Sequence, residues 1–265
     1  MRHFLQLAAV LCASFAGGCS AEPHQAEAAL CQIEGVTRTA RDEVAFCGTI
    51  EQQTYLDLVA ELTPRDRRLR VTSFGGDADA SLKVGALVRQ RDLAVIVDRV
   101  CASGCAHFIF LPARRVRVLE GGIVAFHGTR TYLVEAARAA GLVTAPEAAA
   151  RVQEEKHFLE TAGVATEALY APSDMLRPVC AGVSSVGQRS YIMTTYVAYV
   201  PDLHTVERWR GASVEGFWPA SAKSAGVSIE RFRGRATSVV FGPPKELPPG
   251  GVMDLRRCAD SEHPD

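Results

Sequence analysis

Short apolar runs alternate along the chain with stretches whose apolar residues recur at helical spacing. The apolar runs predict strands at residues 44–50, 69–73, 93–97 and 123–126, and the helical spacing predicts helices at 54–62, 80–91, 102–111 and 144–161. The run at 93–97 is apolar throughout, which is typical of a parallel strand buried on both faces. Strands and helices alternate up to about residue 183, so we expect an α/β fold with parallel strand pairing.

The pattern changes after residue 183. Residues 191–200 are rich in β-formers, and the stretch that follows mixes tryptophans and glycines without a clear period. Residues 242–251 contain four prolines, as a loop would. We therefore expect a main domain at 43–183 and a β-rich C-terminal appendage or small second domain at 184–265. Residues 22–42 are expected to form a linker and an N-terminal hairpin.

Residues 1–21 have the pattern of a signal for export. Arg2 and His3 precede an apolar run at 4–15 that is too short to span a bilayer as a mature helix. Cleavage after Ala21 is one alternative. The other is a bacterial lipobox at 16–19, in which Cys19 becomes the lipidated first residue. Both predict a periplasmic or outer-envelope protein, and only lipidation at Cys19 would place it on a membrane.

The composition adds an unusual number of cysteines. The chain has eight, and six of them stay with the folded part whichever cleavage occurs: Cys31, Cys47, Cys101, Cys105, Cys180 and Cys258. Exported proteins can oxidise such thiols to disulfides. Cys31 and Cys47 flank a turn-prone segment, whereas Cys101 and Cys105 are four residues apart, so either pair could be bonded. The alternative is that some are simply small buried apolar residues.

The charges argue against a nucleic-acid-binding protein. In 265 residues, 29 basic side chains nearly cancel 30 acidic ones, which leaves a formal net charge of −1. A protein that binds phosphates along a nucleic acid needs a basic face. The seven histidines show no spacing typical of metal ligands, and we expect neither a metal nor a cofactor.

Three groups of residues that could carry chemistry follow predicted strands, where open α/β sheets usually bind ligands. The pair Gly75-Gly76 could leave backbone N–H groups free for an oxyanion. Ser103 lies among unpaired N–H donors at the predicted start of a helix. His127 could take the serine proton. Each has a structural alternative, namely an ordinary turn, a helix N-cap and a hydrogen-bonded histidine. Their order along one stretch of chain favours a catalytic serine.

The same residues resemble the Clp protease proteolytic subunit and crotonase superfamily, and more closely its predicted exported bacterial members. In that family a strand leads to a Gly-Gly turn, a second strand to a turn with the nucleophilic serine, and a third to the catalytic histidine. The matching residues are Ser73-Phe74-Gly75-Gly76, Ala102-Ser103-Gly104, the connecting Arg114-Arg115 and Phe126-His127. The resemblance covers about residues 43–183 and implies a repeated β-β-α core.

The resemblance also implies a role for each residue. Ser103 would be the nucleophile and His127 the general base, while the backbone N–H groups of Gly76 and Gly104 would form the oxyanion hole. The family's acid follows the long helix after the histidine, and Asp174 is the candidate at the matching place. A buried acid would orient the imidazole and stabilise the imidazolium that forms.

The chain departs from the family in two respects. Phe74 replaces the proline common before the glycine pair. In addition, Cys101 and Cys105 bracket the serine, and the cytoplasmic proteases lack these two cysteines. We expect an exported serine hydrolase, most simply a peptidase that cleaves peptides or proteins through an acyl-enzyme on Ser103. The alternative is a non-catalytic binding or assembly protein that retains the fold. Relatives form homo-oligomers, which we expect here, but an exported protein would have no ATPase partner.

Overall fold

The computed structural model describes residues 34–139, 146–176, 178–184, 189–194, 198–233 and 239–245. All structural statements below concern these residues. The predicted signal at 1–21, Cys19, Cys31 and Cys258 lie outside them. Cleavage, lipidation and the pairing of Cys31 with Cys47 therefore remain predictions.

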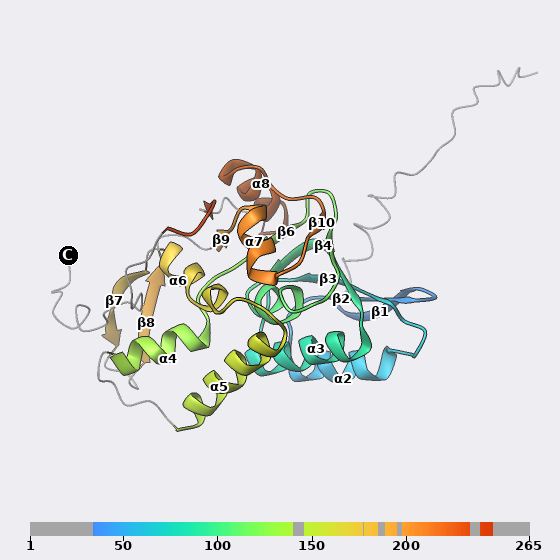
Figure 1. Ribbon diagram of the computed structural model, residues 1–265, viewed down its shortest axis with the longest axis horizontal. Coiled ribbons are helices and arrows are strands. Elements are labelled where there is room, and N and C mark those ends of the chain that lie inside the picture. Colours follow the sequence, from blue (N-terminus) through green and yellow to red (C-terminus); the bar gives the residue numbers. More distant parts are fainter. Residues whose placement is uncertain are drawn as a thin grey trace, which may run out of the picture.

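A central sheet organises the molecule (Figure 1), with strand order β1-β2-β3-β4-β5-β10 and with β6 also paired to β4. Its edge strands are β1 (Gly35–Ala40) and β10 (Glu215–Gly216). Its parallel strands are β2 (Glu43–Cys47), β3 (Arg68–Ser73), β4 (Ala94–Ala102), β5 (Val116–Val118) and β6 (Ile123–Ala125). The predicted α/β class and the parallel pairing are confirmed. The repeated β-β-α arrangement stays a prediction.

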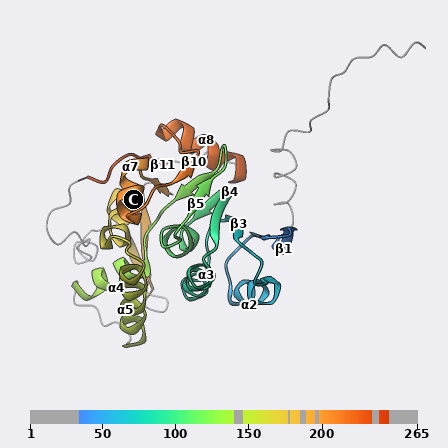
Figure 2. The same ribbon diagram turned by 45° about the vertical axis from the view of Figure 1, so that its right-hand side comes forward.

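Helices connect the strands. They are α2 (Gln52–Glu61), α3 (Ala78–Arg91), the π-helix η1 (Cys105–Phe110), α4 (Arg130–Ala139), α5 (Pro146–Thr161), the 3-10 helix η2 (Thr166–Leu169) and α6 (Ala171–Met175). In Figures 1 and 2, α2 and α3 lie side by side below the sheet and α8 (Ala222–Arg233) lies above it. The described helices include none that is long and apolar enough to cross a membrane.

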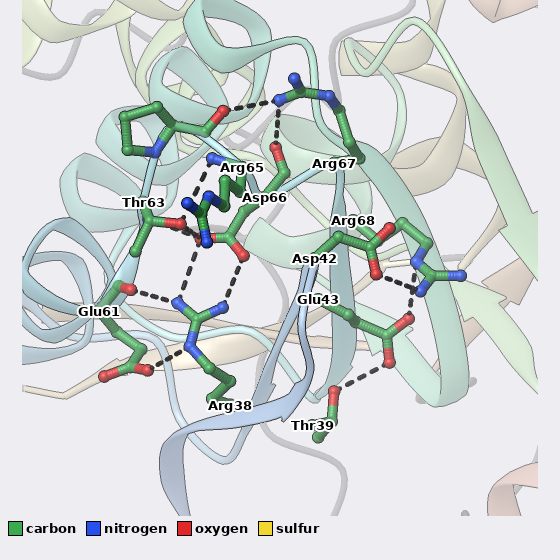
Figure 3. Close-up of polar contacts among 11 residues, drawn as sticks. Arg38, Thr39, Asp42, Glu43, Glu61, Thr63, Arg65, Asp66, Arg67 and Arg68 are labelled. Carbon is green, nitrogen blue, oxygen red and sulfur yellow. Dashed lines mark hydrogen bonds and ion pairs between the residues drawn. The ribbon is translucent and has the colours of Figure 1, made fainter.

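The first two strands form a hairpin. Strand β1 (Gly35–Ala40) pairs antiparallel with β2, and Gly35 lies opposite Cys47. Arg38 fixes this hairpin to the turn between α2 and β3 (Figure 3), because its guanidinium donates to Glu61 at 3.0 Å and to Asp66 at 2.7 Å. The bond from Arg38 lowers the pKa of the buried Asp66 carboxyl to about 2.

The C-terminal segment contains more than strands. Strands β7 (Pro178–Ser184) and β8 (Arg189–Thr194) form one small sheet, and β9 (Ala198–Val200) and β11 (Val239–Phe241) form another. The helices α7 (Leu203–Arg210) and α8 (Ala222–Arg233) were not expected, and β10 (Glu215–Gly216) pairs with β5 at the edge of the central sheet. The segment thus differs from a β-rich appendage, since it adds helices and extends the main sheet.

Buried side chains join the C-terminal segment to the main sheet. Trp209 of α7 has no exposed surface and stacks edge-on against Phe126, as expected for a tryptophan that packs in a core. Arg210 donates to the backbone carbonyls of Phe110 and Ala113, at 2.6 and 2.9 Å, beyond the end of η1. A second apolar cluster lies between the ends of β4 and β6 and the segment: Val100, Ile123, Ala125, Ala198, Val200, Ala225 and Ile229.

Candidate active site

The serine turn lies between the end of β4 and the start of η1. Ser103 has φ = 56°, and Asp92 is the only other non-glycine residue with positive φ in the described part of the chain. Asp92 simply ends helix α3. A side chain held in the left-handed region costs on the order of 1 to 3 kcal/mol, and such residues cluster at functional sites. The backbone N–H of Ser103 donates to the carbonyl of Ala125 at 3.1 Å, which ties the turn to β6.

The helix that follows the serine is a π-helix rather than the α-helix that the sequence predicts over 102–111. It covers Cys105–Phe110, all buried. Short π-helical segments are rare and are often found at functional sites. A disulfide joins Cys101, near the end of β4, to Cys105, the first residue of η1, and both residues are fully buried. One of the two pairs that the sequence allowed is therefore bonded, and it closes a short loop around Ser103.

The glycine turn lies directly against the serine turn. Gly75 has φ = 97°, and a Cβ atom at this position would lie 2.6 Å from the Cβ of Ser103 and 2.8 Å from the carbonyl oxygen of Ala102. A Cβ at Gly76, which has φ = 156°, would lie 2.2 Å from the carbonyl oxygen of Ile50. Any other residue would force these backbones apart. Gly75 therefore allows the turn after β3 to lie against the serine turn after β4, and Gly76 allows it to lie against Ile50 after β2.

Two backbone donors next to Ser103 are unused within the described residues. Ser73 Oγ accepts the N–H of Gly75 at 3.0 Å, whereas neither Gly76 nor Gly104 donates its N–H to another group. The two glycines are neighbours, since a Cβ on Gly104 would lie 3.9 Å from the carbonyl oxygen of Gly76. An N–H group without a partner is rare when water cannot replace the partner. The two N–H groups are therefore without a partner among the described residues.

His127 directly follows β6 but faces its own backbone. Its side chain is exposed, and Nδ1 lies 2.9 Å from the carbonyl oxygen of Gly128. A carbonyl only accepts, so this contact places the proton on Nδ1 and leaves Nε2 with its lone pair. The ring is partly open to water, but the surrounding protein displaces water from the remainder of the ring. This burial lowers the pKa of His127 below its usual 6.5, while the bond to Gly128 acts in the opposite direction. The imidazole is thus neutral at pH 7.

A second imidazole lies beneath the serine turn. His107 is buried, and its Nδ1 lies 3.0 Å from the carbonyl oxygen of Ser103. Burial lowers the pKa of His107 to about 4, so this ring is also neutral. It stacks edge-on against Phe126. His107 therefore supports the backbone of Ser103, a role that its spacing of four residues from the serine could have indicated.

Neither histidine bonds the serine hydroxyl. In the part of the chain that the structure describes, Ser103 Oγ makes no hydrogen bond to His127 or His107, and His127 makes none to Asp174. The Asp174 carboxyl instead accepts from the hydroxyl of Tyr132 at 3.2 Å. Burial raises the pKa of Asp174 to about 6, while the bond from Tyr132 opposes that shift. The structure brings the glycine and serine turns together, whereas the described residues show no hydrogen bond that links the serine, the histidine and the acid.

Helix α6 nevertheless lies against the loop that carries the histidine. A Cβ on Gly128 would lie 3.2 Å from Ser173 Oγ, and Ser173 precedes Asp174 in the chain. The backbone of the loop is also held by Thr129, whose hydroxyl donates to the carbonyl of Leu169 at 2.9 Å. Asp174 is therefore close to the histidine loop in space, although its carboxyl bonds another residue.

An ionic cluster that the sequence did not reveal fixes the other end of the histidine loop. Arg130 donates to Glu155 of α5 and to Asp79 of α3, both at 2.8 Å. Glu155 is fully buried and also accepts from the hydroxyl of Thr131 at 2.6 Å. Since α3 begins directly after the glycine turn, the cluster links the loop after His127 to the helix after Gly76. These residues are far apart in sequence, so no local pattern could have paired them.

A cavity of about 350 Å³ opens beside the histidine and the serine turn. Eight residues line it: Phe74, Val100, Ala102, Ala125, Phe126, His127, Ala198 and Ile229. His127 is the only one of the eight that carries an ionisable group. No group of three or more His, Cys, Asp or Glu side chains that could hold a metal ion occurs among the described residues.

Comparisons with known proteins give only distant structural likenesses. No protein-family model and no curated protein matches the chain. Among solved structures, the ClpP protease catalytic domain from Plasmodium falciparum is similar with 11% sequence identity and a TM-score of 0.37, over 68% of this chain and 87% of that one. The membrane-bound stomatin-specific protease 1510-N is similar with 11% identity and a TM-score of 0.28, over 67% and 96%. Both TM-scores are below 0.5, so the function has to be inferred from this chain's own residues.

Proposed function

We propose that the protein is a serine hydrolase in which Ser103 is the nucleophile and His127 the general base. The observation that carries the proposal is the conformation of Ser103. It has a positive φ between a strand and a helix, beside the backbone N–H groups of Gly76 and Gly104, which have no partner among the described residues. A strained serine next to unused donors is costly for a protein that only packs there, and it is what acyl transfer requires.

The proposed reaction has two steps. Ser103 Oγ attacks a substrate carbonyl while Nε2 of His127 takes its proton, and the resulting oxyanion is stabilised by the N–H groups of Gly76 and Gly104. The tetrahedral intermediate then collapses to an acyl-enzyme as the imidazolium gives its proton to the leaving group. Water, deprotonated by the same imidazole, attacks the acyl-enzyme and releases the acid and Ser103.

In this proposal Nε2 of His127 comes within hydrogen-bond distance of Ser103 Oγ when substrate binds. The Nδ1 contact with the Gly128 carbonyl keeps the proton on the nitrogen that faces away from the reaction. Catalytic hydrogen bonds are often long or absent before substrate binds, so the missing bond between Ser103 and His127 is compatible with catalysis. In this proposal the Gly128 carbonyl does what an acid does in a triad. The role of Asp174 as that acid stays a prediction.

The wider setting is proposed on the sequence. We propose a peptide or protein substrate, export after loss of residues 1–21, and a homo-oligomer, because the motifs around Ser103 and His127 resemble exported members of a protease family. The bond between Cys101 and Cys105 supports a location outside the cytoplasm, since disulfides persist mainly in oxidising compartments.

A binding protein that retains the fold is the second candidate. It is favoured by one observation, namely that His127 bonds its own backbone and Ser103 Oγ bonds no imidazole in the described residues. In that case Ser103 would keep its conformation without reacting.

Labelling with a fluorophosphonate probe separates the two candidates. We expect the native protein to be labelled and Ser103→Ala not to be, with ester hydrolysis reduced roughly 1,000-fold or more. His127→Ala should reduce hydrolysis roughly 100- to 10,000-fold. Ser213→Ala, which alters an exposed serine, is the matched control and should behave as the native protein. Native protein that is folded by circular dichroism, is not labelled and cleaves no ester would instead be the binder.

A further inference from the structure

The cavity beside His127 borders all three parts of the proposed site. Ala102 directly precedes Ser103, Phe74 directly precedes the glycine pair, and His127 itself forms part of the wall. Phe74 is 46% exposed and lies where the cavity meets solvent, whereas most of the other lining residues are buried. The cavity is therefore open to a ligand and adjoins the atoms that would react.

Part of the wall of this cavity belongs to the C-terminal segment. Ala198 of β9 and Ile229 of α8 line it, and both pack with Val100 and Ala125 in the second apolar cluster. Ile229 is only 3% exposed. Both residues lie outside residues 43–183, the stretch in which the sequence resembles a known family. The shape of the cavity is therefore set in part by the C-terminal segment.

We propose that the cavity receives one large apolar side chain on the acyl side of the cleaved bond, and that Ile229 sets the size of the side chain accepted. This inference rests on the proposed function, because it places the substrate carbonyl at Ser103. The acyl group is bonded to Ser103 from the attack on the carbonyl until deacylation. The side chain next to its carbonyl is therefore the part of the substrate that can occupy a cavity bordered by Ala102.

Size and chemistry both favour a large apolar group. An apolar cavity of roughly 150 Å³ is enough to bind benzene, and this cavity is about 350 Å³. Seven of the eight lining residues have only carbon in their side chains, so a carboxylate or ammonium group would lose hydration and find no charged side chain of opposite sign, since His127 is neutral. Filling such a site discriminates between large and small apolar groups by roughly 10- to 100-fold.

The test compares N-acetyl amino-acid p-nitrophenyl esters that differ only in the side chain. With the oxidised native protein we expect kcat/KM for the leucine and phenylalanine esters to exceed that for the alanine and glutamate esters by roughly 10-fold or more. Ile229→Trp fills the cavity and should bring the phenylalanine and alanine esters within roughly threefold of each other. Val227→Trp changes the exposed side of the same helix, where Val227 is 43% exposed, and should leave the preference unchanged.

A second variant keeps the inference testable if Ile229→Trp does not fold. Phe74→Asp puts a charge at the mouth of the cavity on an exposed residue, and it should lower kcat/KM for the phenylalanine ester roughly 10-fold relative to the alanine ester. Labelling of Ser103 by a small methylphosphonofluoridate reports on the proposed function alone. Labelling without any side-chain preference, or a preference that Ile229→Trp and Phe74→Asp both leave intact, overturns this inference and leaves the hydrolase. Absence of labelling in the native protein overturns the proposed function itself.

Discussion

The serine side and the histidine side of the candidate site are built in different ways. On the serine side, close contacts of the backbone fix the turn. Gly75 lies against Ser103, and the disulfide of Cys101 and Cys105 closes the turn. On the histidine side the arrangement depends on side-chain rotamers. His127 bonds the carbonyl that follows it, and Asp174 bonds a tyrosine.

This difference separates what is fixed from what can adjust. The backbone of the serine turn is over-determined by close contacts, so it is in place before any substrate arrives. The imidazole can change partners by rotation about two side-chain bonds, which costs little and is fast. A change on the serine side should therefore cost far more activity than a change on the acid side.

The glycine contact should show the largest effect. Gly75→Ala adds a Cβ that would lie 2.6 Å from the Ser103 Cβ, in a residue whose φ of 97° disfavours any side chain. We expect hydrolysis and probe labelling to fall at least roughly 100-fold, and the free energy of unfolding to fall by about 2 to 4 kcal/mol. Labelling rates and urea denaturation measure the two effects.

Gly163→Ala is the matched control. Gly163 also has positive φ, at 77°, but a Cβ there meets nothing within 4 Å. It should cost about 1 kcal/mol of stability and no activity. If Gly75→Ala is labelled as fast as Gly163→Ala, the contact between the two turns does not hold the nucleophile.

The serine side could be predicted from the sequence because its turns follow strands, and the position of a turn after a strand is set by the geometry of the sheet. Parallel neighbouring strands end at the same edge of a sheet, so Gly75-Gly76 after β3 and Ser103 after β4 had to meet there. The glycines indicated a close approach of two backbones, which the structure contains. The strands and helices next to these turns could be predicted because their apolar residues follow a clear pattern.

The histidine side could not be foreseen in the same way. Which atom the His127 ring bonds, and that Asp174 bonds Tyr132, depend on rotamers and on partners far along the chain. Helices α4, α7 and α8 were not predicted, although α4 and α7 bury at least as many residues as the predicted helix α2. The three-residue strand β5 was too short to give a period.

Removal of the disulfide should affect the serine side alone. In Cys101→Ala/Cys105→Ala a short closed loop is opened, which should lower the free energy of unfolding by about 2 kcal/mol. We expect the rate of labelling at Ser103 to fall roughly 10-fold, because the turn that holds its positive φ loses one restraint. The pKa of His127, followed by its ring signals in NMR, should not change.

The NMR measurement is what makes this test specific. A parallel loss of labelling and shift of the His127 pKa would mean that the two sides are coupled through the turn. A double variant that is labelled at the native rate would mean that the glycine contacts alone fix Ser103.

Replacement of Asp174 should have the smallest effect on activity, and at pH 7.5 it should raise stability, whereas the preceding variants lower it. The pKa of Asp174 is raised from about 3.8 when unfolded to about 6 in the fold, so the folded protein binds the proton more tightly. The stability that the protonated Asp174 carboxyl contributes is fully present below pH 4 and is lost as the pH rises to about 6. Asp174→Asn keeps an acceptor for Tyr132 without the charge. We compare the free energy of unfolding of the variant with that of native protein at two pH values. The difference, variant minus native, should be on the order of 1 to 2 kcal/mol larger at pH 7.5 than at pH 4.

Activity then decides the role of the carboxyl. Because the Gly128 carbonyl already bonds Nδ1 of His127, we expect Asp174→Asn to hydrolyse esters within about threefold of the native rate, whereas loss of a triad acid costs roughly 10,000-fold. Urea denaturation at the two pH values and ester hydrolysis at pH 7.5 give both quantities from one variant. A loss of several thousandfold would show that Asp174 orients His127 during the reaction, and the histidine side would then be as strictly determined as the serine side.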